Sequence, residues 1–220
     1  MKIGFVGLGN VGGKLANNLL ENNFHISVLD KNHILMDEFK LKGAKTAKSI
    51  KDLVMNSDIL ITCLPSPKIC AEVLESKDGI IDTIQKDQIW IEMSTTEDEQ
   101  LKKHASLIKQ KNAIALEAPV SGGCHRAATG NISIFVGGSR EGFDKAMPVL
   151  KCLGRKILYT GDFGSASILK VITNYLATVH LVALGEAWTI ASKSNLDLNK
   201  TYKGIAASSG NSFVHETESQ

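Results

Sequence analysis

The chain has 220 residues, of which 43% are hydrophobic and 22% are charged, and its formal net charge is +2. These values are typical of a globular protein that buries a sizeable core in one large or two small domains. The near-neutral charge gives no electrostatic reason to expect nucleic-acid or membrane partners, and no apolar run reaches about 18 residues, the length of a membrane-spanning helix.

The first thirty residues predict a strand, a glycine-rich turn, a helix and a second strand. An apolar run at 3–6 indicates a buried strand, and a second one at 26–29 indicates another. Between them lie the six residues GLGNVG, a G-x-G-x-x-G sequence, followed by apolar residues at helical spacing. This order is the one expected of a dinucleotide-binding turn.

Each residue of this turn has an expected job. Gly7 permits the tight bend, Gly9 lets a pyrophosphate approach the backbone, and Gly12 lets the helix pack close to the strand. Asn10 and Val11 complete the turn at the start of the helix, where free N–H groups and the helix dipole favour phosphate. The alternative is a glycine-rich turn that binds no ligand.

Asp30 bears on the choice of cofactor. It lies eighteen residues after Gly12, at the end of the second predicted strand, where a carboxylate can accept hydrogen bonds from the adenosine ribose hydroxyls. A carboxylate there repels a 2′-phosphate, so NAD is favoured over NADP, although the adjacent Lys31 can soften that preference. The alternative is that Asp30 is an ordinary turn residue at a strand end.

Strands and helices continue to alternate as far as residue 160. Predicted helices cover residues 33–41, a short stretch after Ser49, 69–74, 97–110 and 141–153. Predicted strands cover residues 58–62, 88–92, 113–116, 132–136 and 156–159. This alternation predicts an α/β fold with a doubly wound, Rossmann-type, largely parallel sheet.

Two loops after predicted strands are candidates for the ligand-binding edge of this sheet. The first is the sequence CLPSP at 63–67, whose prolines hold an extended turn; the alternative is a rigid loop without a ligand. The second is the Ser/Thr cluster at 94–96, which is expected to cap the helix 97–110. A role of this cluster near the nicotinamide is a separate hypothesis.

The pattern changes after Gly161. Residues 164–194 contain no proline and predict one long helix that is apolar on more than one face, so we expect other elements to bury it on several sides. A short helix at 199–207 and a polar tail follow. We therefore expect a dinucleotide-binding domain at 1–160 and a partial helical domain for substrate or dimerisation at 161–220.

Lys170 stands out on the long helix because its neighbours in sequence are apolar, and Asn174 lies four residues further on the same side. Burial lowers the pKa of a lysine, which makes it a usable proton donor and acceptor. Taken alone, however, a single lysine on a helix is usually a solvated side chain.

The four cysteines, Cys63, Cys70, Cys124 and Cys152, show no C-x-x-C pairing, and no export signal precedes the first predicted strand. We expect reduced thiols, no metal site, and a location in the cytoplasm or the mitochondrial matrix.

Six motifs follow one another along the chain: GFVGLGNVG, CLPSP, EMSTT, EAPVSGG, TGNISIFVGG, and a G-x-x-G-x-x-x-x-x-K-x-x-x-N pattern that ends at Asn174. With them the chain resembles the 3-hydroxyisobutyrate dehydrogenase family of β-hydroxyacid dehydrogenases over essentially its whole length. The resemblance implies NAD(P)-dependent oxidation of a short β-hydroxyacid to its semialdehyde, or the reverse reduction, as in valine catabolism. It also implies a homodimer or homotetramer.

The resemblance implies roles for individual residues as well. Lys170 would be the general acid/base at the substrate hydroxyl, and Asn174 would support the substrate. The substrate carboxylate would be held by Ser121, Gly122 and Gly123, whose backbone N–H groups and hydroxyl supply donors. The cofactor cleft would be lined by Leu64, Pro65 and Thr95.

The chain departs from the family in two places. His125 and Arg126 follow the S-G-G sequence, where they either add a cation near the acidic end of the substrate or lie on the surface. Family members also continue with further helices, so the chain is expected to be a truncated product or a shortened relative. Two other functions stay open: a non-catalytic dinucleotide-binding protein, which would not need Lys170 with Asn174, and a relative of 6-phosphogluconate dehydrogenase, which would need a phosphate-binding basic cluster.

Overall fold

The structure of the protein, a computed structural model, describes residues 1–96 and 98–219. The chain divides into two units, Met1–Lys170 and Val171–Gln220, and the division falls inside helix α9 (Ser165–Lys193). The division into domains of residues 1–160 and 161–220 stays a prediction.

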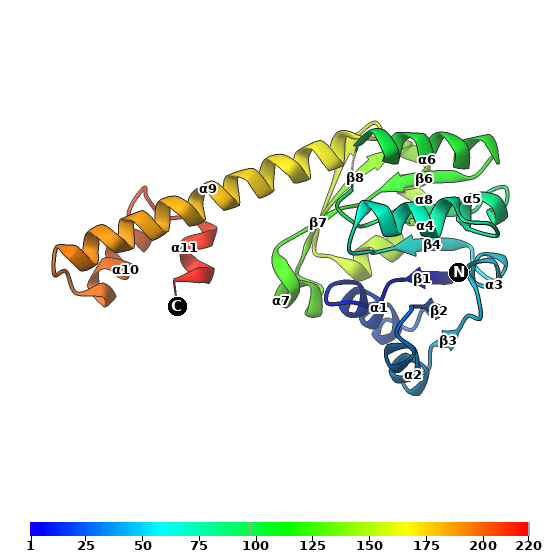
Figure 1. Cartoon of the computed structure of the whole chain (residues 1–220), viewed down its shortest axis with the longest axis horizontal. Coiled ribbons are helices and arrows are strands. Elements are labelled where there is room, and N and C mark those ends of the chain that lie inside the picture. The colour runs from blue at the N-terminus through cyan, green and yellow to red at the C-terminus, as the bar shows by residue number, and fades with distance from the viewer. Residues whose placement is uncertain (97, 220) are drawn as a thin grey trace. The chain divides into compact units, whose positions relative to one another are not determined.

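Nine strands of the described residues form one sheet in the first unit (Figure 1). They are β1 (Lys2–Val6), β2 (His25–Leu29), β3 (Lys45–Thr46), β4 (Ile59–Thr62), β5 (Ile89–Glu92), β6 (Ile114–Glu117), β7 (Val120–Ser121), β8 (Ser133–Gly138) and β9 (Lys156–Gly161). The order is β3-β2-β1-β4-β5-β6-β8-β7, and β9 pairs with β8. The first six strands in this order, from β3 through β1 to β6, are parallel to one another, whereas β8 runs antiparallel to β6 and β7. The order 3-2-1-4-5-6 is that of doubly wound dinucleotide-binding sheets, which confirms the predicted fold class.

Helices cover both faces of this sheet. They are α1 (Gly12–Glu21), α2 (His33–Leu41), α3 (Ile50–Met55), α4 (Pro67–Glu75), α5 (Ile80–Thr83), α6 (Asp98–Gln110), α7 (Gly123–Ala128) and α8 (Arg140–Leu153). Ile59 and Ile61 of β4 belong to a core cluster with α1, α2 and α8, while Leu60 belongs to a second cluster with α3, α4 and α6. Because neighbouring strand residues point to opposite faces, an almost wholly apolar strand such as β4 fills both cores.

Several elements begin where local chemistry directs them. Helix α2 has the predicted bounds, and the Asn32 side chain caps it by accepting from the Ile34 amide. Helix α4 begins two residues earlier than predicted because Ser66 caps it and Pro67 occupies its first turn, a position where proline costs no hydrogen bond. The predicted start of helix 97–110 falls on residue 97, which lies outside the described residues.

Five short elements were not predicted: β3, β7, α5, α7 and α11 (Phe213–Glu218). Strand β3 has two residues that pair with Ser27 and Val28 of β2, and so it depends on its neighbour rather than on its own sequence. Helix α11 is capped by Ser212, which accepts from the amide of His215, in a stretch that the sequence suggested was a polar tail.

Helix α9 corrects two expectations. It is exposed rather than buried on several sides, with Val171, Val182 and Ile190 between 59% and 67% exposed, because little of the described chain packs against it. It is also long and apolar enough to cross a membrane, with a mean hydropathy of 1.5 over its most apolar window, although no such segment was expected. One such helix is weak evidence for a membrane span, since a helix inside a soluble protein can have the same length and apolar composition.

In the second unit, α10 (Leu198–Ala206) and α11 lie beside the second half of α9 (Figure 1). The buried ring of His215 lies between two other rings: its centroid is 6.2 Å from that of Trp188 and 4.6 Å from that of Tyr202. These contacts between aromatic rings hold the three helices of the unit together.

Candidate functional site

The glycine-rich turn between β1 and α1 has the geometry that dinucleotide binding needs. Gly7 has a φ of +96°, and a Cβ there would lie 2.3 Å from the Cys63 carbonyl oxygen. A Cβ on Gly12 would lie 2.1 Å from the Gly7 carbonyl oxygen. A Cβ on Gly9, in contrast, would meet no atom within 4 Å. Gly7 and Gly12 are therefore required by the fold, whereas Gly9 faces open space at which a ligand can approach.

Asp30 binds this turn directly. Its Oδ2 accepts a hydrogen bond of 2.6 Å from the Leu8 amide, and its Oδ1 accepts one of 2.8 Å from the Asn32 amide. The carboxylate therefore joins the end of β2 to the glycine-rich turn, a contact that the sequence did not reveal. The neighbouring Lys31 extends its ammonium to Glu72, with an Nζ to Oε2 distance of 3.3 Å.

The loops after β4 and β5 meet beside the same turn. The Leu64 amide donates a 2.7 Å hydrogen bond to the Ser94 hydroxyl, and the Leu64 side chain lies 3.0 Å from the position of a Cβ on Gly7. Pro65 and Thr95 are exposed in these two loops. The buried Ser94 thus joins two loops. The helix cap expected of the cluster 94–96 involves residue 97, outside the described residues, and stays a prediction.

A buried carboxylate, Glu92, lies beneath both loops. Its Oε2 accepts from the Thr62 hydroxyl at 2.8 Å, and its Oε1 accepts from the Ser94 amide at 2.8 Å. Burial raises the pKa of Glu92, and hydrogen bonds from Ser94 and Thr62 oppose that shift. Burial also raises the pKa of the nearby Cys63 and Cys70 thiols to about 12, so both are poor nucleophiles at neutral pH.

The raised pKa of Glu92 predicts a pH dependence of stability. The folded state keeps this proton at pH values at which the unfolded state has lost it, so the stabilising contribution is complete below the unfolded pKa and is lost as the pH rises through the folded one. In Glu92→Gln, the free energy of unfolding should therefore fall less steeply, as the pH rises above the usual glutamate pKa of about 4.3, than in the wild type. There, this one proton changes the free energy of unfolding by at most about 1.4 kcal/mol per pH unit. Urea unfolding at a series of pH values measures this slope. Glu38→Gln, the same change at an exposed site, should keep the wild-type slope, and an unchanged slope in Glu92→Gln would contradict the assignment.

The S-G-G sequence forms a tight backbone turn at another part of the sheet edge. Ser121 ends β7, and Gly122 and Gly123 have φ values of +132° and +79°. A Cβ on Gly123 would meet no atom within 4 Å, so the approach to its backbone is open. His125 and Arg126 follow as exposed residues of α7, in keeping with the surface alternative.

Lys170 is half-buried near the start of α9, and burial lowers its pKa. Asn174 follows four residues later on the same helix, is exposed, and lies in the second unit. The direction of the pKa shift is the one expected of a lysine that exchanges protons.

Glu117 is a residue of the site that sequence analysis missed. It ends β6, is fully buried, and accepts hydrogen bonds from the first turn of α9, including those from the amides of Gly164 at 2.7 Å and Ala166 at 2.8 Å. Because Ser121 lies four residues after Glu117 and Lys170 lies three residues after Ser167, this carboxylate links the two predicted substrate-binding segments. In the sequence, the one indication of this role was that Glu117 is an acidic residue at the end of a predicted strand.

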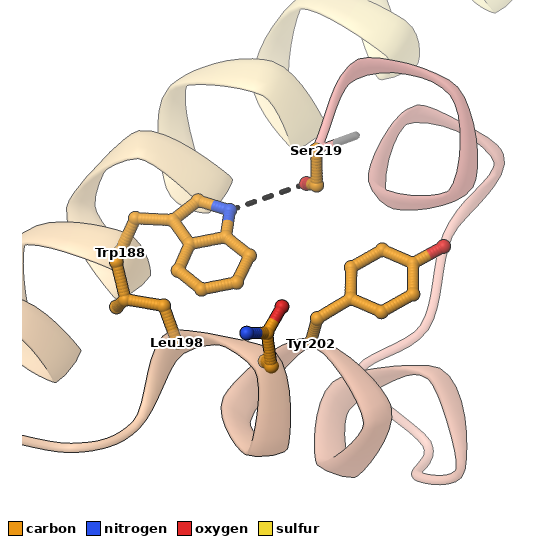
Figure 2. A pocket seen from close by; sticks show the side chains of 5 residues that line it. Trp188, Leu198, Tyr202 and Ser219 are labelled. Atoms are coloured by element: carbon orange, nitrogen blue, oxygen red, sulfur yellow. Dashed lines mark hydrogen bonds between the residues drawn. The ribbon is translucent and has the colours of Figure 1, made fainter.

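The second unit contains a cavity of about 440 Å³, lined by Trp188, Leu198, Asn199, Tyr202 and Ser219 (Figure 2). Trp188 Nε1 donates a 3.2 Å hydrogen bond to the Ser219 hydroxyl at its edge. None of the predicted site residues lines this cavity. Across the described residues, no group of three or more His, Cys, Asp or Glu side chains gathers as a metal site.

Two protein-family models together match almost the whole chain. Residues 2–161 match the NAD binding domain of 6-phosphogluconate dehydrogenase, and residues 164–220 match the model described as NAD-binding of NADP-dependent 3-hydroxyisobutyrate dehydrogenase. All of α9 lies in the second model, so this apolar helix is part of a domain known from dehydrogenases.

Curated relatives agree with these models. The rat mitochondrial 3-hydroxyisobutyrate dehydrogenase is 33% identical over 215 residues, which are 98% of this chain and 64% of that protein. The NAD-dependent L-serine dehydrogenase of Pseudomonas aeruginosa is 30% identical over 98% of this chain and 72% of its own length. The chain thus spans less than two thirds of the length of the rat relative.

A solved structure matches the fold as well. The 3-hydroxyisobutyrate dehydrogenase of Mycobacterium tuberculosis with L-serine superposes with a TM-score of 0.90 at 26% identity, covering 98% of this chain and 73% of that one. The matched models, the relatives and this fold agree with the order of motifs in the sequence. The chain belongs to the 3-hydroxyisobutyrate dehydrogenase family of β-hydroxyacid dehydrogenases.

Proposed function

We propose that this chain acts in an NAD(P)-dependent dehydrogenase reaction, in which it binds the cofactor and carries the proton-transfer lysine. The reaction would oxidise a short β-hydroxyacid such as 3-hydroxyisobutyrate to its semialdehyde, or reduce the semialdehyde. The observation that carries the proposal is Lys170, a half-buried lysine with a lowered pKa in the same unit as the open glycine-rich turn. We further propose a homodimer or homotetramer, supported by the exposed apolar residues of α9. We also propose a location in the cytoplasm or the mitochondrial matrix, supported by the mitochondrial relatives.

The residues present fit the cofactor. Gly9 leaves open space above the turn, and α1 begins without a side-chain cap, so its first amides suit a pyrophosphate. Asp30 lies where the ribose hydroxyls would bind, and Leu64, Pro65 and Thr95 would line the cleft beside it. When bound, the nicotinamide ring supplies the acceptor or donor of hydride.

The chain's own residues would then bind the acid and move its proton. A neutral Lys170 Nζ would take the proton of the substrate hydroxyl during oxidation and return it during reduction. The amides of Gly122 and Gly123 and the hydroxyl of Ser121 would bind the carboxylate, since donors without a full charge suffice for one anion. Asn174 would support the substrate from the next turn of α9.

Asp30 favours NAD over NADP in this proposal. Replacing it with asparagine removes the negative charge but keeps an oxygen that can accept from the Leu8 amide. In Asp30→Asn, the ratio of the Kd for NADP+ to the Kd for NAD+ should fall about tenfold, the equivalent of about 1.4 kcal/mol. Titration calorimetry with both cofactors measures this ratio.

Lys31→Ala is the matched control for Asp30→Asn, because the Lys31 ammonium extends to Glu72. It should change the ratio by less than about twofold, as expected of an exposed ion pair. An unchanged ratio in Asp30→Asn would mean that Asp30 serves only the turn.

The proposed reaction is tested by following the nicotinamide absorbance with NAD+ or NADP+ and a panel of acids: 3-hydroxyisobutyrate, L-serine, glycerate and 6-phosphogluconate. Each is also tested in the reverse direction, which for glycerate is the reduction of tartronate semialdehyde. The relatives named for 3-hydroxyisobutyrate and for L-serine make these two acids the first choices. Turnover of one short hydroxyacid supports the proposal. Turnover of 6-phosphogluconate alone would favour a relative of 6-phosphogluconate dehydrogenase, and cofactor binding without any turnover would favour a non-catalytic binding protein.

A further inference from the structure

We propose that Glu117 is a positioning residue: it holds the first turn of α9, and with it Lys170, against the strand edge that carries the S-G-G turn. The proposal rests on the proposed function of Lys170, but its structural half, the attachment of α9 to β6, can be tested without catalysis.

The attachment consists of four donors that converge on one carboxylate. Oε1 of Glu117 accepts from the amides of Gly164 at 2.7 Å and Ala166 at 2.8 Å. Oε2 accepts from the Ser167 amide at 3.2 Å and from the Ser167 hydroxyl. A carboxylate accepts on both oxygens, and its negative charge suits the positive end of the helix dipole, so an ionised side chain satisfies the start of α9.

The residues around the Glu117 carboxylate leave no space for an added side chain beside it. Gly137 of β8 pairs with Glu117 across the sheet, and a Cβ there would lie 2.3 Å from Glu117 Oε1. Glu117 itself is 0% exposed. A buried charge that lost these donors would be costly, which means that the start of α9 has one strongly preferred position relative to β6.

The position of Lys170 follows from that of the first turn. Lys170 lies three residues after Ser167, or about 4.5 Å along a helix, and a helix transmits a shift at one turn to the next. On the other side, four residues of backbone lead from Glu117 to Ser121. Displacement of a catalytic group by about 1 Å can cost about 100-fold in rate, so this single link has leverage on the reaction.

The test compares Glu117→Gln and Ser167→Ala with the control Ser165→Ala in the full chain. A glutamine presents an NH₂ group where two donors already point, and Ser167→Ala removes one donor only. The Ser165 hydroxyl bonds Thr160 and Asp162 in the same turn but not Glu117, so its loss should leave kcat within about twofold. Four quantities are measured in each variant: amide hydrogen exchange, the Kd of NADH, the pH profile of Lys170 acylation and the pH profile of kcat.

In Glu117→Gln we expect exchange of the Gly164, Ala166 and Ser167 amides to rise at least about tenfold, with exchange in β1 and β4 unchanged. The Kd of NADH should stay within about twofold, and kcat should fall by about 10- to 100-fold. The acylation profile of Lys170 should move toward that of an exposed lysine. Ser167→Ala should show smaller changes in the same directions, which keeps the proposal testable should Glu117→Gln fail to fold.

The proposal would be overturned if amide exchange in the first turn of α9 stayed unchanged in these variants. It would also be overturned if kcat fell only in proportion to the loss of folded protein or of NADH affinity. If the wild type turns over no hydroxyacid, the proposed function fails. The exchange and acylation measurements then still decide whether Glu117 holds α9 and Lys170 in place.

Discussion

Lys170→Ala should lower kcat for hydroxyacid oxidation by about 10²- to 10⁴-fold, the range that general acid–base catalysis contributes. Burial lowers the pKa of this lysine. A fraction of the protein molecules therefore carries a neutral Lys170 at pH values at which an exposed lysine is still protonated, and this neutral amine can accept the hydroxyl proton. In the wild type, kcat should therefore rise with pH as Lys170 loses its proton, and Lys170→Ala should lack this rise. Stopped-flow absorbance of the nicotinamide over a series of pH values measures both effects.

Two further variants separate proton transfer from charge. Lys170→Arg keeps the positive charge but cannot lose a proton near neutral pH, so it should be as inactive as Lys170→Ala. Lys193→Ala removes an exposed lysine from the last turn of the same helix and should leave kcat unchanged. Retained activity in Lys170→Arg, or loss of NADH affinity together with kcat in Lys170→Ala, would contradict the proton-transfer role.

Gly9→Ala should weaken NADH binding by at least about tenfold, since the added methyl group lies where the pyrophosphate must approach the backbone. Its stability should change by less than about 0.5 kcal/mol, a value typical of surface substitutions, because a Cβ at this position meets no atom within 4 Å. Fluorescence titration with NADH and urea unfolding measure the two quantities.

Gly12→Ala is the matched comparison in the same turn. A Cβ there would lie 2.1 Å from the Gly7 carbonyl oxygen, so the turn itself must move and the variant should lose stability as well as affinity. Equal losses of stability in the two variants, or unchanged NADH affinity in Gly9→Ala, would show that the turn serves the fold only.

Much of the first unit could be predicted because local signals and burial agree there. An apolar run such as 59–62 has no alternative to a strand buried on both faces, and the residues after it are placed at the sheet edge by the parallel topology. The glycine-rich turn could be interpreted residue by residue, because each glycine meets a distinct steric demand.

What could not be predicted depends on contacts between distant residues. Asp30 bonds the Leu8 amide, and Glu117 bonds amides about fifty residues later; neither partner can be identified from spacing. Short elements such as β3 and α7 lack a periodic pattern of useful length. Helix α9 was expected to be buried because its composition is apolar, but composition does not say whether residues of the same chain cover it.

The most direct test of the proposed dehydrogenase activity follows the transfer of deuterium from substrate to cofactor. One substrate is 3-hydroxyisobutyrate deuterated at the carbinol carbon, and the second is serine deuterated at its hydroxymethyl carbon. The chain is incubated with NAD+, and the recovered nicotinamide is analysed by mass spectrometry. We predict one deuterium in the reduced nicotinamide with wild type and at least about 100-fold less in the same time with Lys170→Ala. Tight NAD+ binding with no transferred deuterium from either acid would contradict the proposal.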